Sequence, residues 1–379
     1  MSVELRGTKK NGEEFLLPVG TDTQSLILSE RQLTSLDLGP LELCKGLVEL
    51  RLDSNVIESI DLSALQYCRQ LRILDLRHNA IDSVDLLPLK DCTNLMSLSI
   101  GADWFRALND DIELGLTELD LTPLQNCQKL EDINLCNNRL SSIDLAPLKD
   151  CTALRSVALD WNALNTLDLS ALKTCRRLES ISLSWNKLSS INLSPLGDHR
   201  ALKRINLSDN ALVSIYLSPF EECTGLKILN LRRNRLVSVD LSSLQFCHHL
   251  EELDLGENRI ASIDLGPLKS CSRLRVLDLM ANMLVSIDLS PLKNCMCLEH
   301  LWLSFNELAE VDITPLQYLK SLIGIALNQR SKGKLVYSGG TPSDSLPRPL
   351  KKYTEDAGKK ESSETKRSTD HPEFSVDNN

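Results

Sequence analysis

The sequence of 379 residues has few aromatic residues, which make up 4% of it, although 42% of its residues are apolar. Its apolar mass is therefore mostly leucine and isoleucine, which suits a layered core of similar side chains. It lacks a run of about 20 apolar residues, so no segment is predicted to span a membrane. Residues 1–20 carry several charges and no continuous apolar run, so they are not predicted to be a secretory signal. The formal net charge of -10 argues against nucleic acid or an anionic membrane as the main partner.

Sequence motifs of catalysis are also missing. The chain has no glycine-rich phosphate loop, no HExxH, no GxSxG and no CxxC pair. Its six histidines are scattered along the chain: His78, His199, His248, His249, His300 and His371. We therefore predict that the protein is not an enzyme and needs no cofactor.

The sequence is dominated by one internal repeat of 24 residues. The segment from Leu71 to Asn94 reads LRILDLRHNAIDSVDLLPLKDCTN, and the same frame recurs from Leu226 to His249. We call each 24-residue repeat a rung and number its positions from its first leucine. Apolar residues then fall at positions 1, 4, 6, 11, 14, 16 and 19. Asparagine falls at position 9, aspartate at 15 and cysteine at 22. The asparagines are Asn55, Asn79, Asn138, Asn162, Asn186, Asn210, Asn234, Asn258, Asn282 and Asn306.

The LxxLxLxxN pattern at this period resembles the leucine-rich repeat, and it covers roughly residues 23 to 330 in about a dozen rungs. The resemblance implies an α/β solenoid, a horseshoe with a parallel concave β-sheet and short helices or 3-10 turns on the convex side. Alternation in LxLxx predicts a short strand with one buried face, and stacked rungs would close a continuous core. Position-9 asparagines are expected to bond to backbone groups at the turn and to each other.

Three segments are predicted along the chain. Residues 1–22 would form an N-terminal cap, and residues 23–338 the solenoid, whose last residues, 331–338, would cap the other end. Between Asp103, which takes the asparagine position, and Asn138 the gap is 35 residues, which places an insertion at about 104–116. From residue 339 to 379 the composition changes to Ser, Thr, Pro, Lys and Glu, which predicts a disordered polar tail.

Ten cysteines share position 22: Cys44, Cys68, Cys92, Cys127, Cys151, Cys175, Cys223, Cys247, Cys271 and Cys295. We interpret them as small apolar side chains that fill a turn, in a reduced, cytoplasmic protein. A metal site would need ligands that converge on a point, whereas one cysteine per rung gives a line; stacked disulfides are the other alternative. Cys136, at position 7, is expected to be the most exposed thiol.

Ten aspartates share position 15: Asp37, Asp61, Asp85, Asp120, Asp144, Asp168, Asp240, Asp264, Asp288 and Asp312. We expect each to accept backbone N–H bonds where the return turn begins, because Asn192 replaces one of them and can accept the same bond. A calcium-binding edge is the alternative. After this row, the Ser-Pro pairs at 194–195, 218–219 and 290–291 predict helices with serine as N-cap and proline as first helical residue.

Positions 2, 3, 5, 7 and 8 are not used by the core and should form the binding surface. Aromatic residues gather there: Trp161 and Trp185 at position 8, Trp302 at position 5 with Phe305 after it, and Trp104 with Phe105 at the start of the insertion. Charged residues also group there: Lys203, Arg204, Lys227, Arg232 and Arg233, followed by Glu251, Glu252, Asp254 and Glu257. They would either be a solvated surface or the polar rim of an interface. The insertion is the candidate specificity element.

We therefore expect a non-catalytic scaffold or adaptor that binds a protein on its concave face. The resemblance suggests partners such as phosphatases, GTPases or ubiquitin-ligase components. Two alternatives are left open: a sensor of a small ligand or Ca²⁺ through the acidic row or the insertion, and a regulator that makes its contact through the tail.

Overall fold

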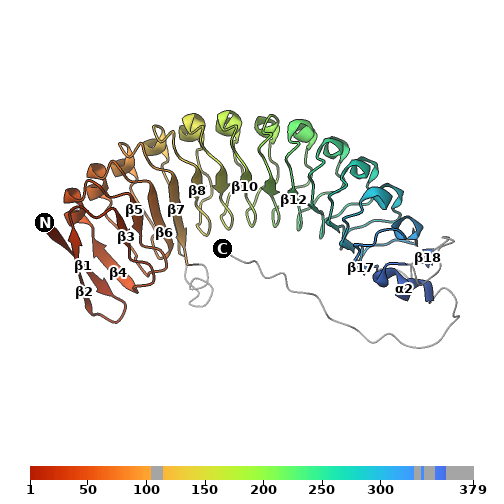
Figure 1. Cartoon of the computed structure of the whole chain (residues 1–379), viewed down its shortest axis with the longest axis horizontal. Helices are drawn as coiled ribbons and strands as arrows, with labels where there is room; N and C mark the ends of the chain where they lie inside the picture. Colours follow the sequence, from red (N-terminus) through yellow and green to blue (C-terminus); the bar gives the residue numbers. More distant parts are fainter. Residues whose placement is uncertain (104–113, 328–333, 337–345, 356–379) are drawn as a thin grey trace.

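The computed structural model describes residues 1–103, 114–327, 334–336 and 346–355 and shows a curved solenoid (Figure 1). Its rungs stack side by side in an arc, with short helices along the outer edge and strands inside them. The predicted leucine-rich-repeat architecture is confirmed, because one strand from each rung joins a single large parallel sheet of 13 strands in the described part of the chain.

Most strands of this sheet are three residues long, with the middle residue buried and the residues on either side of it more exposed. In β10 (Ser180–Ser182), Ile181 is buried at position 4 while its two neighbours face outward. Parallel pairing places each residue beside its equivalent in the next rung, 24 residues away for Ile181 and Ile205 and 35 away where the insertion separates β7 from β8. The strands are β3 (Ser25–Ile27), β5 (Glu49–Arg51), β6 (Ile73–Asn79), β7 (Ser97–Ala102), β8 (Asp132–Asn134), β9 (Ser156–Ala158), β10, β11 (Arg204–Asn206), β12 (Ile228–Asn230), β13 (Glu252–Asp254), β14 (Val276–Asp278), β15 (His300–Trp302) and β17 (Gly324–Ala326).

The asparagine at position 9 joins neighbouring rungs. Asn282 is buried, and its Oδ1 accepts the backbone N–H of Ile260 in the preceding rung at 3.0 Å. Its Nδ2 donates to the carbonyl oxygens of Leu255, one rung back, at 2.9 Å and Leu279, in its own rung, at 3.1 Å. Asn186 makes the equivalent bonds. The predicted bonding to backbone groups is confirmed, whereas the described asparagine side chains bond to the neighbouring backbone instead of to each other.

The return segments are 3-10 helices capped by the aspartate row. Asp264 Oδ1 accepts the backbone N–H of Gly266 at 2.7 Å, and the other nine aspartates of the row make the same bond two residues on. Asn192 also does so. The helices are η1 (Gly39–Leu43), η2 (Ser63–Tyr67), η3 (Leu87–Leu89), η4 (Thr122–Leu124), η5 (Ala146–Asp150), η6 (Ser170–Thr174), η7 (Ser194–Leu196), η8 (Ser218–Glu222), η9 (Ser242–Phe246), η10 (Gly266–Ser270), η11 (Ser290–Asn294) and η12 (Thr314–Leu316).

The prediction of serine N-caps was wrong. In η7, Leu193 is the N-cap residue and makes no side-chain capping hydrogen bond, while Ser194 is the first helical residue and Pro195 the second. The leucine must occupy this position because its side chain belongs to the core. The polar residue that satisfies the first free N–H therefore lies one step earlier, at position 15.

The cysteines of position 22 line the core beneath these helices. All ten are buried, and all twelve cysteines of the chain are free. Cys68 Sγ lies 3.5 Å from the carbonyl oxygen of Leu41 and 3.6 Å from that of Cys44, both in the preceding rung. Burial raises the pKa of the Cys68 thiol to about 11, so it is protonated and able to donate. Cys136 is only half-buried, but the most exposed thiol belongs to Cys297, which corrects the expectation for Cys136.

Separate elements close the two ends of the core. Near the N-terminus, β1 (Ser2–Lys9) pairs antiparallel with both β2 (Glu14–Gly20) and β4 (Leu33–Asp37), and Leu5 of β1 is fully buried. At the other end, β18 (Lys334–Val336) pairs in parallel with β16 (Glu310–Asp312).

Part of the segment predicted as a disordered tail is ordered instead. Residues Arg348–Glu355 form the helix α2, next to β17, and Leu350 joins the core. The apolar end of the last rung needs a cover, and this leucine supplies part of it. Within the described ranges, no helix has the length and apolarity needed to cross a lipid bilayer.

Candidate functional site

The turn after each concave strand presents one outward residue in an unusual backbone conformation. In eleven rungs the residue at position 8 has a positive φ, between 52° for Arg233 and 60° for Phe305, although none of the eleven is glycine. This left-handed conformation turns the backbone so that the next residue, usually the asparagine at position 9, faces the core. The position-8 side chains consequently form a row along the rim of the concave sheet.

Trp161 and Trp185 are neighbours in this row and stack on each other. Their ring centroids are 4.1 Å apart and the rings are inclined by only 7°. Each side chain is still 41% exposed. The predicted exposure of both tryptophans is thus observed, although they lie on the rim, just after β9 and β10, and not on the strands themselves.

Short side chains cover the sheet beside the tryptophan pair. Ser156, Ala158, Ser180 and Ser182 are the outward residues of β9 and β10. One of them, Ser182, is hydrogen-bonded to Asp160, at position 7. Its Oδ1 accepts hydrogen bonds from Ser182 Oγ at 2.6 Å and the Ser184 backbone N–H at 2.7 Å. Serine and amide donors therefore fix this carboxylate and partly offset its charge.

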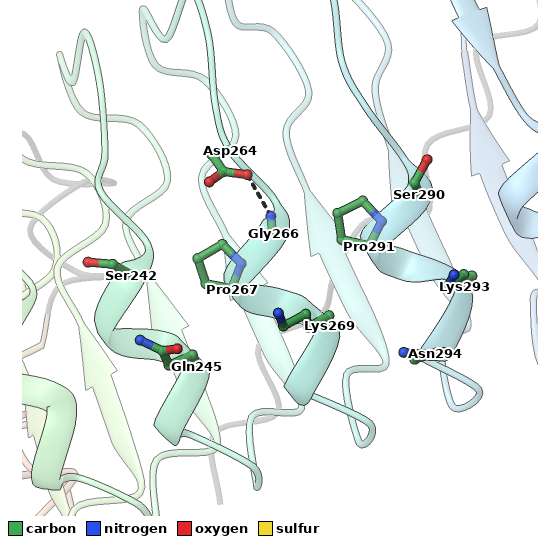
Figure 2. Close-up of a pocket in the computed structure, with 10 residues that line it drawn as sticks. All are labelled: Ser242, Gln245, Asp264, Gly266, Pro267, Lys269, Ser290, Pro291, Lys293 and Asn294. Carbon is green, nitrogen blue, oxygen red and sulfur yellow. Dashed lines mark hydrogen bonds between the residues drawn. The ribbon is translucent and has the colours of Figure 1, made fainter.

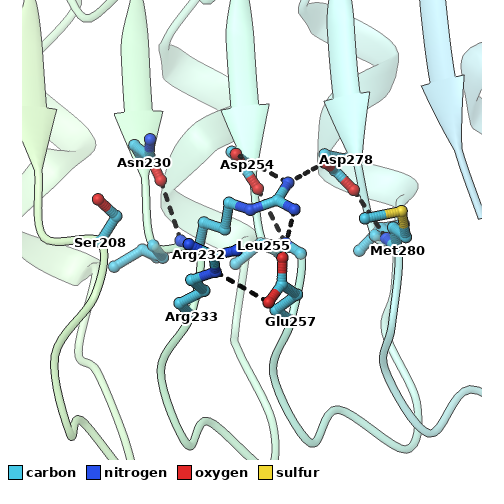
Figure 3. A network of polar contacts seen from close by, with 12 residues as sticks. Ser208, Asn230, Arg232, Arg233, Asp254, Leu255, Glu257, Asp278 and Met280 are labelled. Atoms are coloured by element: carbon cyan, nitrogen blue, oxygen red, sulfur yellow. Dashed lines mark hydrogen bonds and ion pairs between the residues drawn. The ribbon is translucent and has the colours of Figure 1, made fainter. Parts of the chain in front are cut away.

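A network of ion pairs centred on Arg232 occupies the next part of the concave face (Figure 3). Arg232 Nη1 lies 2.8 Å from Asp278 Oδ2 and 3.9 Å from Asp254 Oδ2, and Nη2 contacts Glu257. Arg233 pairs with the same Glu257 through Nε at 2.9 Å. The arginine side chain thus crosses two neighbouring rungs and joins three of them into one polar surface.

Carboxylates outnumber cations in this network, and burial raises the pKa of some of these carboxyl groups. Burial, and after it the nearby Asp278 carboxylate, raises the pKa of Asp254 to about 7. Burial also raises the pKa of Glu252, while Arg204 lowers it by its charge. Arg204 and Glu252 themselves lie two strands apart, on β11 and β13, and no ion pair joins them in the described part of the chain.

The other lysines and glutamates of the predicted charge groups pair across rungs at position 2. Lys203 contacts Glu179, and Lys227 Nζ lies 2.9 Å from Glu251 Oε1. Arg155 continues the row by bridging Glu131 and Glu179. The basic and acidic groups noted in the sequence are therefore largely matched to one another.

Trp302 belongs to a separate aromatic site near the C-terminal end. It lies on β15 and stacks on His300, with ring centroids 5.3 Å apart. The next strand approaches closely here, since a Cβ atom at Gly324 would lie 2.7 Å from His300 Nδ1. Phe305 is 46% exposed in the position-8 row. The aromatic residues predicted for the binding surface thus form two sites in the described part of the chain, with the Arg232 network between them in the order of rungs.

Trp104, Phe105 and most of the insertion lie outside the described residues. The repeat resumes at Leu116, whose backbone N–H is bonded to Asn138 Oδ1 at 3.0 Å. Gly115, just before it, has a φ of +98°, and a Cβ atom there would lie 3.0 Å from Asn138 Cα. Only glycine fits this return to the ladder.

The convex side has a shallow depression between η9, η10 and η11 (Figure 2). Its lining repeats the same few residue types from rung to rung: Ser242, Gln245, Asp264, Gly266, Pro267, Lys269, Ser290, Pro291, Lys293 and Asn294. This composition follows from the repeat itself and shows no convergence on a ligand. Among the described residues, no three His, Cys, Asp or Glu side chains are placed to hold a metal ion.

Comparison with known proteins agrees with this architecture. A family model described as Leucine rich repeat matches residues 22–81, 128–188, 200–260, 224–284 and 248–308. The chain therefore belongs to the leucine-rich-repeat family. Proteins of this family are generally non-catalytic binding scaffolds, and the repeat is commonly a protein-interaction domain. No curated protein matches the chain significantly.

Solved structures give the same fold. An internalin of Listeria monocytogenes is 24% identical, with a TM-score of 0.68, and the match covers 89% of this chain and 88% of the internalin. The functional domain of InlJ from the same organism, which includes a cysteine ladder, is 21% identical over 82% of this chain and 64% of that one, with a TM-score of 0.61. A plant peptide hormone receptor in complex with RGF2 is 25% identical over 80% of this chain and 50% of the receptor, with a TM-score of 0.63.

Proposed function

We propose that this protein is a non-catalytic scaffold or adaptor that binds a protein partner on its concave face, with the tryptophan pair as anchor. The observation that carries the proposal is the stack of Trp161 on Trp185 at the rim. Two large rings that remain 41% exposed after packing on each other offer apolar area that a partner can cover. The plant receptor of the same fold, which is in complex with RGF2, supports a binding role.

The surroundings of the pair suit an interface in two ways. The serines and the alanine of β9 and β10 are short, so a partner can approach the backbone of the sheet beside the rings. The Arg232 network, in contrast, is held by several ion pairs before any partner arrives. Little side-chain freedom is then lost on binding, which favours affinity and a defined orientation. The contact would extend toward the C-terminal end through Arg204, Glu252, Trp302 and Phe305.

The test compares two double variants with matched loss of aromatic area. Trp161→Ala/Trp185→Ala removes the rim pair, and Tyr67→Ala/Phe246→Ala removes two aromatic residues that are 47% and 40% exposed on the convex helices. Proteins captured by the wild-type chain from native lysate are identified by quantitative mass spectrometry. The binding of one purified captured partner is then measured by calorimetry.

We expect the tryptophan variant to weaken binding of that partner at least 10-fold and the convex variant to leave it unchanged. If the partner binds the wild type and the tryptophan variant with equal affinity, the tryptophan pair is not part of the binding site. Far-ultraviolet circular dichroism of both variants checks that the solenoid is intact.

We further propose that the protein acts in the cytoplasm. The twelve free thiols suit a reducing compartment, where they stay reduced. Fractionation of cells that express the full chain tests this, and recovery outside the cytoplasm would reject it.

A further inference from the structure

A second exposed surface lies on the segment that follows the asparagine ladder, at positions 10 and 12 of the repeat. Position 11 is a fully buried leucine or isoleucine, for example Leu212, Leu236 and Ile260. The residues on either side of position 11 are more exposed than position 11 itself in these rungs, so they face outward together. Neighbouring rungs are joined at this level by backbone hydrogen bonds, such as Arg235 N–H to the Leu212 carbonyl at 2.8 Å.

Position 12 changes character halfway along the solenoid. In the N-terminal half it is polar in every described rung, half-buried at Thr34 in the first rung and exposed in the six that follow: Glu58, Asp82, Thr117, Ser141, Asn165 and Ser189. In the next five rungs it is apolar and still exposed: Val213, Val237, Ala261, Val285 and Ala309. The three valines are 52%, 58% and 56% exposed. We name these five residues the apolar stripe.

The fold does not require this stripe, because six rungs with the same backbone carry polar residues at the same position. Single exposed apolar residues are ordinary on protein surfaces, but an unbroken row across five rungs is not. Met283, at position 10 beside Val285, is 44% exposed and widens the stripe. The row therefore has the character of a surface that another molecule covers.

The charges beside the stripe define that molecule further. Arg235 and Arg259, at position 10 in two of the same rungs, are exposed, and neither forms an ion pair with another described residue. Lys187 is exposed at the same position near the start of the stripe. The arginines of the concave network, in contrast, are all matched by carboxylates. In the last stripe rung, position 10 is instead the exposed Glu307. A partner that carries acidic side chains next to apolar ones would complement the part of this edge that holds Arg235 and Arg259.

The spacing of the rungs distinguishes a helical partner from an extended one. Adjacent rungs are about 4.8 Å apart, so five stripe residues span about 19 Å. An α-helix laid across the rungs repeats its apolar side chains every 5.4 Å, close to one per rung. A β-strand repeats them on one face every 6.6–6.8 Å, which falls out of step within about three rungs. About 13 residues of helix would cover the whole stripe.

We propose that the apolar stripe binds an amphipathic α-helix of a partner protein, with apolar residues at i, i+4, i+7 and i+11 and acidic residues on the flank that faces Arg235 and Arg259. This surface is separate from the tryptophan pair, so helix binding to the stripe and partner binding to the tryptophan pair can be tested independently. Its energy comes from covering the valines, and its orientation comes from the arginines.

The experiment selects peptides against the full chain from a display library of 16-residue helices with randomised faces. The enriched peptide is synthesised with a fluorescent label, and its Kd is measured by anisotropy. We expect an amphipathic consensus with acidic flanks and a Kd that rises at least 10-fold in Val213→Ser/Val237→Ser/Val285→Ser. Serine already occupies this position at Ser141 and Ser189, so the variant should fold. Arg235→Glu/Arg259→Glu should also raise the Kd at least 10-fold.

Two control variants accompany these measurements. The first control is Ser141→Ala/Ser189→Ala, in the polar half of the same row. The second is Trp161→Ala/Trp185→Ala, and both should bind the peptide like the wild type. The proposal is overturned if no helical consensus is enriched, if the enriched peptide binds the valine variant equally well, or if the tryptophan variant alone loses binding. It is also overturned if sedimentation shows a wild-type dimer that the valine variant abolishes, because a second copy of the chain would then be the occupant.

Discussion

The imidazole of His199 donates a hydrogen bond from Nε2 to the carbonyl oxygen of Leu172 at 3.0 Å. His199 stands at position 22, where ten other rungs have cysteine. Cys223, one rung later, makes the same contact from Sγ to the carbonyl of Leu196 at 3.4 Å. A carbonyl oxygen only accepts, so the proton of the neutral ring is on Nε2, and the buried Nδ1 has no partner among the described residues.

This substitution makes one rung sensitive to acid. Burial lowers the pKa of His199, because the charged imidazolium is poorly solvated in the core. The unfolded chain therefore binds the proton more readily than the folded one, and stability is lost as the pH falls through the ordinary histidine pKa near 6.5. We predict that His199→Cys loses less stability than the wild type between pH 7.5 and pH 5.5. Urea unfolding at both pH values measures this, and parallel losses in the two proteins would contradict it.

The buried asparagines should contribute more to stability than the exposed ones. Asn282 makes hydrogen bonds to backbone groups of two rungs, so Asn282→Ala leaves those groups buried without partners. We predict a loss of about 1–3 kcal/mol in the free energy of unfolding, measured in urea. Asn165→Ala, at an exposed position 12, is the matched control and should change the free energy by less than about 0.5 kcal/mol. Similar losses in both variants would show that the ladder bonds are not the cause.

The aspartate row should act as a set of helix caps and not as a calcium site. We predict that Asp264→Asn keeps the melting temperature within error, since an amide oxygen can accept the Gly266 N–H as Asn192 does for Ser194. Asp264→Ala should lower it, because that N–H loses its acceptor. Adding millimolar Ca²⁺ or a chelator should leave the wild-type midpoint unchanged. A rise with Ca²⁺ that Asp264→Ala diminishes would favour the ion-binding alternative.

The Arg232 network should become less favourable as the pH rises. Burial and Asp278 raise the pKa of Asp254 to about 7, whereas an unfolded aspartate titrates near 4. The proton is bound more tightly in the folded state, so this stabilisation is present at pH 4 and is lost as the pH rises through about 7. We predict that Asp254→Asn is more stable than the wild type at pH 8, by on the order of 1 kcal/mol, and that the advantage shrinks at pH 5. An advantage that is independent of pH, or one equally large in Asp240→Asn, would reject this.

The repeat was predictable because it obeys strict local rules. A leucine at positions 1, 4 and 6 can be buried only if the strand faces one way, so the periodicity indicates the sheet, the layered core and the stacking. The role of the aspartate row also followed from sequence, since Asn192 at the same position showed that a hydrogen-bond acceptor is what the site needs. The Ser-Pro pairs misled, because serine is a common N-cap, whereas here the core requires a leucine at that position.

The sequence by itself determined which residues are buried and which face outward, because burial repeats with the period of the chain. Contacts between outward residues of different rungs depend on the curvature, the turn geometry and the reach of each side chain, which no local pattern encodes. Only the tertiary structure decided that Trp161 lies flat on Trp185, that Arg232 crosses to Asp278, and that part of the supposed tail covers the last rung. The stacking of rungs brings together residues that are 24 or more positions apart, and binding surfaces are built from such neighbours.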